Sequence, residues 1–203
     1  SYFKPLVYRP LSIDMSSLHS PWQTYVPRIR RAHRHWLTDT GSLTQKLKEH
    51  SLNFAVERRG QYHSPVPLTE SQAIHMPLTR QVWQRDVVLL CNGTPVVYAH
   101  TVTPLETVSR DWPFFKRLGN KALGVALFAN PLIHRAPFEF TRLCARDELY
   151  QSAQKALHSH GITLPRHIWA RRCVFHNIRQ ADSRMMVTEI MLPAIYDLQR
   201  ISR

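Results

Sequence analysis

The sequence predicts an α+β fold in which a single antiparallel β-sheet is covered by helices. Hydrophobic residues make up 43% of the 203 residues and charged residues 20%, which is typical of a globular chain rather than a disordered or fibrous one. Two β-branched runs meet at an Asn-Gly pair, and this arrangement predicts a hairpin. The segments follow one another as helices, hairpin, helix and strands, an order that favours an antiparallel sheet over alternating βαβ units.

The N-terminal region differs in its pattern from the rest of the chain. Residues 1–22 contain Pro5, Pro10 and Pro21 without a sustained period, so they predict an extended N-terminal arm. Residues 23–203 have the length of one domain, and we expect them to form a single domain with a core of ordinary size.

Two helices are expected after the arm. Between Trp22 and Trp36, apolar residues recur at spacings of three and four, which predicts a helix with a basic, solvated outer face. Turn-forming residues then lead to Ser42, a suitable N-cap for a helix with Leu43 and Leu47 on one face. The free backbone N–H groups at such a helix start suit a carboxylate.

The first strands are predicted from alternation and turn chemistry. Residues 54–59 alternate as in a strand, residues 60–67 indicate a loop, and residues 78–85 lead back into the sheet. The hairpin extends from Arg85 to Val102 and turns at Asn92-Gly93, because a type I′ turn needs two residues that tolerate positive φ.

The second half of the chain carries fewer clear signals. A short helix is expected within Leu118 to Phe128, with Asn120 as its candidate N-cap. The remaining expected elements are a strand at 138–146, a helix at 148–158, and strands at 169–178 and 185–192 that flank a turn at 180–183.

The net charge of +13 is the one feature of the composition that points to an anionic partner. The Lys and Arg residues are scattered and no recognition motif accompanies them, so we do not expect nucleic-acid binding. Peripheral membrane contact and attraction of small dianions stay open. The sequence has no apolar run long enough to cross a bilayer and no apolar signal core, which predicts a cytoplasmic protein.

Common cofactor and metal motifs are absent from the sequence. It contains no Walker loop, no dinucleotide-binding glycine motif, no zinc-protease motif and no nucleophile elbow. The twelve histidines match no zinc spacing, and Cys91, Cys144 and Cys173 are an odd number at unrelated spacings. We therefore expect a site without metal or cofactor, and three free thiols.

Two charged residues lie in apolar strand-like segments. Arg85 begins the hairpin, and Glu189 lies within the run from Met185 to Leu192, where a carboxylate is costly unless it has a partner. From the residues alone three interpretations remain open. Glu189 could face solvent on an edge strand, it could pair with Arg85 as an internal salt bridge, or both could anchor a ligand.

Several stretches, in consistent order between residues 36 and 196, together resemble the chorismate pyruvate-lyase family. Each stretch is weak by itself, and the specificity comes from their order. They are Asp39-Thr-Gly-Ser-Leu-Thr44, Arg85, Leu89-Leu-Cys-Asn-Gly93, Thr101-Val-Thr-Pro104, Leu118-Gly-Asn-Lys-Ala-Leu-Gly124, Trp169-Ala-Arg-Arg172 and Thr188-Glu-Ile-Met-Leu-Pro193.

The resemblance implies a fold and an activity. In this family an antiparallel sheet carries an internal product pocket closed by two helix-turn flaps, which would begin here near Ser42 and Asn120. It also implies a lyase that converts chorismate to 4-hydroxybenzoate and pyruvate without metal or cofactor, as the first committed step of ubiquinone biosynthesis. We expect such a protein to be a monomer.

The resemblance also assigns roles to four residues. The family's product-binding arginine falls on Arg85, its carboxylate on Glu189, and its two flap contacts on Leu43 and Leu123. Arg85 offers a planar fork for the ring carboxylate, Glu189 would meet the 4-hydroxyl, and Leu43 and Leu123 would supply backbone N–H groups and an apolar lid. Arg85 and Glu189 are then the expected catalytic residues, a benzene ring apart.

This chain departs from the family's pattern at His100, where family members commonly have an arginine. If that arginine assists ligand entry or binds the pyruvyl carboxylate, a neutral imidazole would weaken the contact near pH 7 and make activity sensitive to pH. His100 is therefore an additional candidate for substrate binding, and a tolerated substitution is the alternative.

Two mechanisms and two other functions stay open. The reaction could be an intramolecular, retro-ene-like hydrogen transfer, or an acid–base elimination helped by Glu189. The main alternative function is a noncatalytic sensor domain of the same fold that binds a small carboxylate, and the third is a nucleic-acid binder. Sensor domains of this kind usually follow a DNA-binding helix-turn-helix, for which residues 1–35 are short and rich in proline.

Overall fold

The computed structural model describes residues 21–26 and 28–201. The predicted N-terminal arm lies outside the described residues, apart from Pro21 and Trp22. The described chain contains a seven-stranded sheet in the order β1-β2-β3-β7-β6-β4, in which β5 also pairs with β6. Every strand pair is antiparallel, which confirms the predicted sheet. The strands are β1 (Phe54–Pro65), β2 (Gln81–Cys91), β3 (Thr94–Pro104), β4 (Ile133–Arg135), β5 (Glu139–Leu143), β6 (Ile168–Asn177) and β7 (Gln180–Met191).

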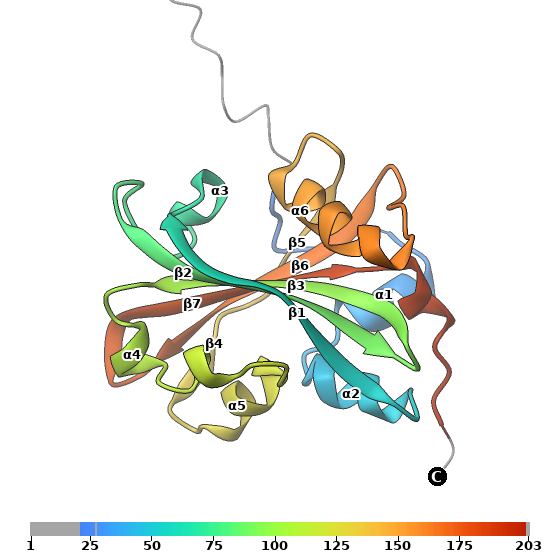
Figure 1. Ribbon diagram of the computed structural model, residues 1–203, viewed down its shortest axis with the longest axis horizontal. Helices are drawn as coiled ribbons and strands as arrows, with labels where there is room; N and C mark the ends of the chain where they lie inside the picture. Colours follow the sequence, from blue (N-terminus) through green and yellow to red (C-terminus); the bar gives the residue numbers. More distant parts are fainter. Residues whose placement is uncertain (1–20, 27, 202–203) are drawn as a thin grey trace, which may run out of the picture.

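Helices cover both faces of this sheet, which Figure 1 shows nearly edge-on. We call its two sides the α5 face, with Val87, Val97 and Cys173, and the α6 face, with Val88, Tyr98 and Ile190. The α5 face packs against α1, α2, α4 and α5, and the α6 face against α3 and α6. The helices are α1 (Arg31–Leu37), α2 (Leu43–Glu49), α3 (Leu68–Ser71), α4 (Val108–Asp111), α5 (Leu123–Ala129) and α6 (Glu148–Leu157), with single 3-10 turns η2 (Phe115–Arg117), η3 (His158–His160) and η4 (Pro193–Asp197).

The hairpin between β2 and β3 is confirmed. Asn92 has a φ of 51° and Gly93 a φ of 80°, the positive values that a type I′ turn requires. The side-chain oxygen of Asn92 also accepts hydrogen bonds from the backbone N–H groups of Leu52 and Asn53, both at 3.0 Å. The turn therefore holds the start of β1 as well.

The helix expected between Trp22 and Trp36 is wrong for its first half, because the helix begins at Arg31. The backbone of Gln23 instead pairs with Phe140 of β5 in both directions, at 2.9 and 2.7 Å. Pairing with a strand over a hundred residues away satisfies the backbone groups that a helix would have used.

The loop expected at residues 60–67 is also wrong. β1 continues to Pro65, and its register shifts between Arg58 and Gly60, where one extra residue forms a bulge. The bulge interrupts the alternation of exposed and buried residues, so the strand pattern is lost just where the strand continues. In the same way, the predicted turn at 180–183 lies inside β7, which begins at Gln180.

None of the helices in the described part of the chain is long and apolar enough to cross a membrane.

Candidate active site

A cavity of about 60 Å³ lies on the α5 face, which is room for the centres of several water molecules. Its floor is formed by alternate residues of β2, β3, β7 and β6, and its cover by the first turns of α2 and α5. It is lined by Gly41, Leu43, Thr44, Arg85, Val87, Leu89, Ala99, Thr101, Ala122, Leu123, Gly124, Leu127, Phe128, Arg135, Phe138, Arg171, Cys173, Phe175, Val187 and Glu189.

The strand register places Arg85 and Glu189 on this floor. Arg85 pairs with Thr101 of β3, and Glu189 pairs with Ala99 of the same strand. Two strand spacings separate β2 from β7, so the two residues begin roughly 10 Å apart across the sheet. No ion pair joins them among the described residues, so the internal salt bridge is wrong. The edge-strand interpretation is wrong too, since β7 lies between β3 and β6.

Arg85 is a buried cation, with only 2% of its surface exposed. Its Nη2 donates to the backbone carbonyls of Gly119 and Lys121, both at 2.9 Å, while its buried Nε has no hydrogen-bond partner in the described residues. Burial and the nearby Arg58 lower the pKa of Arg85 to about 10, which leaves the guanidinium charged at neutral pH. A buried charge without a counter-ion is costly, and an anionic ligand would remove that cost.

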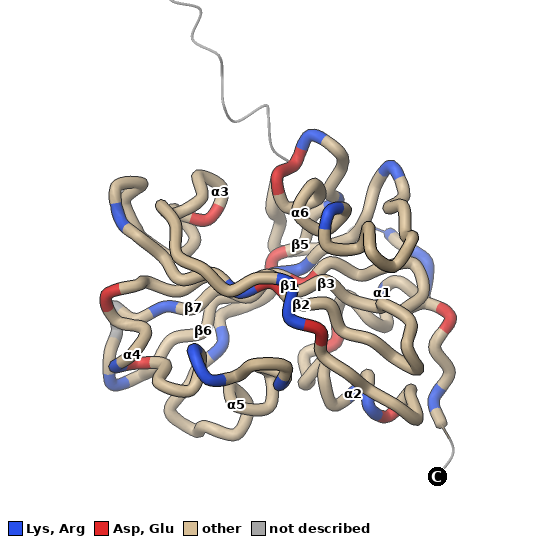
Figure 2. The backbone as a smooth tube through the Cα atoms, viewed as in Figure 1, with Lys and Arg blue, Asp and Glu red and all other residues tan. Residues whose placement is uncertain are grey.

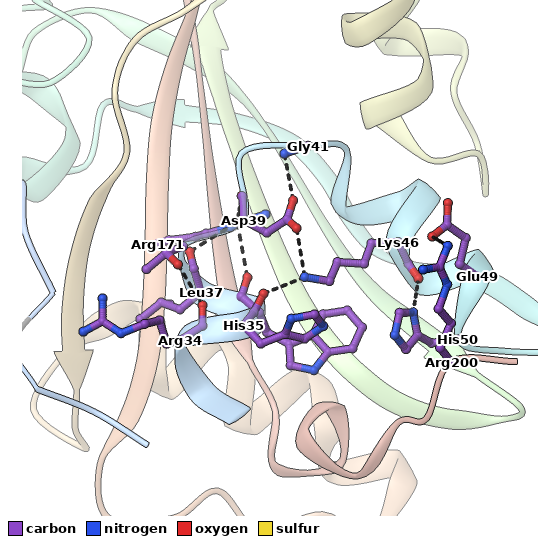
Figure 3. A network of polar contacts seen from close by, with 12 residues as sticks. Arg34, His35, Leu37, Asp39, Gly41, Lys46, Glu49, His50, Arg171 and Arg200 are labelled. Atoms are coloured by element: carbon purple, nitrogen blue, oxygen red, sulfur yellow. Dashed lines mark hydrogen bonds and ion pairs between the residues drawn. The ribbon is translucent and has the colours of Figure 1, made fainter. Parts of the chain in front are cut away.

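Glu189 is held by an arginine of the neighbouring strand. Nε of Arg171 on β6 donates to Glu189 Oε2 at 2.6 Å, and Arg171 is 1% exposed. The Nη1 group of Arg171 donates to the carbonyl of Asp39 at 2.7 Å and to that of Leu37 at 3.3 Å. Figure 3 shows Arg171 beside Leu37 and Asp39. Because Arg171 also holds Glu189, it ties that carboxylate to the segment between α1 and α2.

That segment is held in place by an ion pair between Asp39 and Lys46. The Asp39 carboxylate accepts hydrogen bonds from the backbone N–H of Gly41 at 2.7 Å and from Nζ of Lys46 at 2.9 Å (Figure 3). Burial alone would raise the pKa of Asp39, but these hydrogen bonds lower it below its usual value. The brace fixes the backbone immediately before Leu43.

Both predicted flaps cover the cavity. Leu43 is 5% and Leu123 is 8% exposed, and both line it. Ser42 is the N-cap of α2 as predicted, accepting from the backbone N–H of Gln45 at 3.3 Å. Asn120 is not the N-cap of α5, because Ala122 takes that place and the Asn120 side chain accepts from the backbone N–H of Arg58 at 3.3 Å.

The two flaps contact each other through a glycine. A Cβ atom built on Gly124 of α5 would lie 3.2 Å from Oγ1 of Thr44 on α2. That distance is tighter than ordinary van der Waals contact, so the close approach of α2 and α5 depends on the missing side chain.

Arg135 is a third cation of the cavity, after Arg85 and Arg171, and the sequence did not predict its role. It lies on the short strand β4, donates to the carbonyl of Thr40, and stacks over Phe138 at 4.6 Å and Phe128 at 5.3 Å from the ring centroids. It forms no ion pair within the described residues. Arg171 was missed as well, although its motif belongs to the stretches that carry the family resemblance.

His100 does not line the cavity, because it points to the α6 face. Its Nδ1 lies 2.5 Å from Oδ1 of Asp86 and its Nε2 lies 3.0 Å from Oε1 of Glu70. Burial alone would lower the pKa of His100, but the two carboxylates raise it to about 10. The expected neutral imidazole is therefore wrong, since His100 keeps a positive charge near pH 7.

The cavity's thiol is not a nucleophile at neutral pH. Burial and the nearby Glu189 raise the pKa of Cys173 to about 12, so the thiol stays protonated. All three cysteines are free. Within residues 21–26 and 28–201, no group of three His, Cys, Asp or Glu side chains is placed to hold a metal ion.

Comparison with known proteins gives a family and close relatives. Residues 22–201 match the family model described as "Chorismate lyase". A probable chorismate pyruvate-lyase from Ralstonia nicotianae is 38% identical over 184 residues, which cover 89% of this chain and 93% of that protein. Another from Nitrosomonas eutropha is 39% identical over 165 residues, covering 81% of this chain and 89% of its own length.

Solved structures share the fold with little sequence similarity. The effector domain of PhnF from Mycobacterium smegmatis has a TM-score of 0.57 at 10% identity, covering 77% of this chain and 91% of that domain. The C-terminal domain of the histidine utilization repressor from Pseudomonas syringae has a TM-score of 0.53 at 14% identity, covering 74% of this chain and 100% of that domain. These likenesses concern the fold alone.

Proposed function

The chain belongs to the chorismate lyase family, and we propose that it converts chorismate to 4-hydroxybenzoate and pyruvate. It is an enzyme of the lyase class. One observation carries the proposal. Buried Arg85 has no acidic partner in the described chain and shares its cavity with Glu189, two strands away. A ring with a carboxylate at one end and a hydroxyl at the other would give Arg85 an anionic partner and Glu189 a hydrogen-bond donor.

The reaction turns a cyclohexadiene into an aromatic ring. In chorismate the ring carboxylate is para to the hydroxyl, and the enolpyruvyl ether is attached beside the hydroxyl. The bond between the ring and the ether oxygen breaks, and the carbon that bears the hydroxyl loses its hydrogen. The electron pair of that carbon–hydrogen bond enters the ring, and the ether oxygen becomes the keto oxygen of pyruvate.

The cavity residues would bind and orient this ring. Arg85 would take the ring carboxylate, and Glu189, held at Oε2 by Arg171, would accept a hydrogen bond from the hydroxyl. Leu43, Leu123 and Leu127 supply apolar walls that exclude water. Holding a reactive conformer in a dry site lowers the barrier by positioning and desolvation.

Two routes for the hydrogen remain to be distinguished. In the retro-ene-like route the hydrogen moves directly to the methylene carbon of the leaving group. In the acid–base route Glu189 removes it as a proton, and the departing enolate of pyruvate takes a proton from water at its methylene carbon. Chorismate deuterated at the hydroxyl-bearing carbon separates them. Deuterium retained in the methyl group of pyruvate favours the first route, and its loss to water favours the second.

The function itself is tested by a coupled assay. Protein treated with EDTA is mixed with chorismate, and pyruvate is followed through lactate dehydrogenase while 4-hydroxybenzoate is measured by chromatography. We expect the two products in equal amounts. Folded protein that binds 4-hydroxybenzoate but releases no pyruvate would instead support a noncatalytic carboxylate sensor, the candidate that the shared fold with effector domains favours.

The proposal extends to the role and setting of the protein. The 4-hydroxybenzoate formed would be the ring precursor of ubiquinone, made in the cytoplasm by a monomer. The chain's charge of +13 does not argue for a nucleic-acid surface, because Lys and Arg lie around the described chain instead of gathering on one side (Figure 2). Size-exclusion chromatography coupled to light scattering tests the monomer, and sedimentation with anionic vesicles tests peripheral membrane contact.

A further inference from the structure

We infer that Arg135 binds the second carboxylate of the substrate, the one on the enolpyruvyl side chain, and thereby contributes to the binding of the substrate but not to that of its monocarboxylate product. The inference rests on the proposed function. It begins from the charges that line the cavity, which are the guanidinium groups of Arg85, Arg135 and Arg171 and the single carboxylate of Glu189.

These charges do not balance each other. Arg171 is paired with Glu189 at 2.6 Å, which leaves Arg85 and Arg135 without an acidic partner in the part of the chain that the structure describes. Two carboxylates would balance these two cations, and one would not. Chorismate brings two, and 4-hydroxybenzoate keeps only the ring carboxylate.

Arg135 lies at the end of the cavity where the second carboxylate is needed. Cζ of Arg171 lies 4.3 Å and Cζ of Arg135 lies 4.6 Å from the centroid of the Phe138 ring. Arg135 therefore shares a neighbour with the arginine that holds Glu189. Arg85 is held instead by the carbonyls of Gly119 and Lys121. Because the ether and the hydroxyl occupy neighbouring ring carbons, a hydroxyl that meets Glu189 directs the ether side chain toward Arg135.

The guanidinium of Arg135 has donors to spare. A guanidinium carries five N–H groups, and the structure accounts for one hydrogen bond, to the carbonyl of Thr40. Its stacking on Phe138 and Phe128 holds the planar group in one orientation, and a preoriented fork suits a carboxylate better than a mobile ammonium.

The competing explanation is that Arg135 only braces the flaps. Thr40 belongs to the loop before α2 and Phe128 to α5, so Arg135 contacts both covers of the cavity. A brace would support every ligand alike. An anchor for the second carboxylate would matter for the substrate and hardly for the product, and this difference is what the experiment measures.

The experiment compares two ligands across five proteins. The ligands are 4-hydroxybenzoate and 3-(carboxymethoxy)-4-hydroxybenzoate, a stable ether with a second carboxylate, and both are titrated by calorimetry beside the KM for chorismate. The proteins are the wild type, Arg135→Gln, Arg135→Lys, Arg85→Gln and the control Arg142→Gln. Arg142 is an exposed arginine that stacks on Trp169 at 5.7 Å and does not line the cavity.

We expect Arg135→Gln to raise the KM for chorismate and the Kd of the dicarboxylate about 10- to 100-fold, as when a charged partner is removed from a buried ion pair. The Kd of 4-hydroxybenzoate should change less than about twofold. Arg135→Lys should recover part of the loss, Arg85→Gln should weaken both ligands, and Arg142→Gln should weaken neither. Folding of each variant is checked by thermal unfolding.

Two results would overturn the inference. One is an equal loss of both ligands in Arg135→Gln, which would make Arg135 a brace, and the other is an unchanged affinity for the dicarboxylate. Failure of the proposed function looks different, because the wild type would release no pyruvate while its dicarboxylate binding could still depend on Arg135. Calorimetry with the stable ether tests the inference in either case.

Discussion

The two faces of the sheet differ in whether their buried charged side chains have partners of opposite charge. On the α6 face His100 lies between Asp86 and Glu70, at 2.5 and 3.0 Å, and Arg172 lies 2.7 Å from Glu139. On the α5 face Arg85 has only backbone carbonyls as partners and keeps a buried Nε without one. On the α6 face each of these charges lies against an opposite charge, although Glu70 Oε2 is buried without a hydrogen-bond partner in the described residues. The α5 face leaves the positive charge of Arg85 for a ligand to neutralise.

This difference separates residues that hold the fold from residues that hold a ligand. Removing one partner from a buried ion pair leaves the other uncompensated, and the cost appears as lost stability. Removing a buried charge that has no counter-ion stabilises the folded state, and the loss appears as weaker ligand binding instead. Sites of function are where such uncompensated groups are expected.

The largest effect should come from breaking the α6 face. His100→Gln leaves the carboxylates of Asp86 and Glu70 without their cation, and we expect the free energy of unfolding to fall by about 3–5 kcal/mol. The melting temperature should then fall by roughly 6–20 °C for a chain of this size. Calorimetric unfolding measures this, with His100→Arg as the control that keeps a positive charge. Unchanged stability would mean that the pairing contributes little.

The next effect should come from Arg85→Gln on the α5 face. Binding of 4-hydroxybenzoate should weaken about 100- to 1000-fold, because the ring carboxylate loses a buried charged partner. The melting temperature should stay constant or rise, since the variant no longer buries an unpaired cation. Isothermal titration and thermal unfolding on the same samples test both statements. A large fall in stability would remove the distinction between the two faces.

A smaller effect is expected for Glu189→Gln. The amide keeps the shape of the side chain but removes the anionic acceptor for the hydroxyl, so kcat/KM and product affinity should each fall about tenfold or more. Steady-state kinetics and calorimetry measure the two changes. If both values match the wild type, Glu189 serves only to pair with Arg171, as in the α6-face pairs.

The last effect is a gradual one with pH, small within any single pH unit. The folded pKa of His100, about 10, lies above its usual 6.5, so its contribution to stability is complete below pH 6.5 and is lost as the pH rises through 10. The fall is at most about 1.4 kcal/mol per pH unit within that window. Urea unfolding between pH 6.5 and 10.5 should show it in the wild type and not in His100→Gln. The pH profiles of kcat/KM for wild type and His100→Arg should coincide.

The sequence predicted those parts of the fold that depend only on the backbone preferences of a few adjacent residues. The turn at Asn92-Gly93 and the N-cap at Ser42 each follow from the backbone preferences of the residues concerned. The segment at 22–30 could not be predicted in this way, because its partner Phe140 is distant in the chain. The bulge in β1 hid a strand by interrupting its alternation.

The same limit applies to the site. Arg85 and Glu189 stand out as charges in apolar strands, so a single sequence draws attention to them. Arg135 lies on a strand of three residues whose place is set by pairing with Phe175, and nothing in its neighbourhood indicates a cavity. The sequence around Glu70, which lies on a four-residue helix, does not indicate that its carboxylate raises the pKa of His100.

The contact between the flaps gives position 124 an unusual influence on the size of molecules that the protein can admit. Since a Cβ there would lie 3.2 Å from Thr44 Oγ1, even a methyl group would act as a wedge between α2 and α5. If the Thr44 side chain does not give way by the few tenths of an ångström required, α2 and α5 would separate, and bulkier rings and water would then enter. The selectivity of the enzyme for a small ring would then depend partly on the absence of a side chain at position 124.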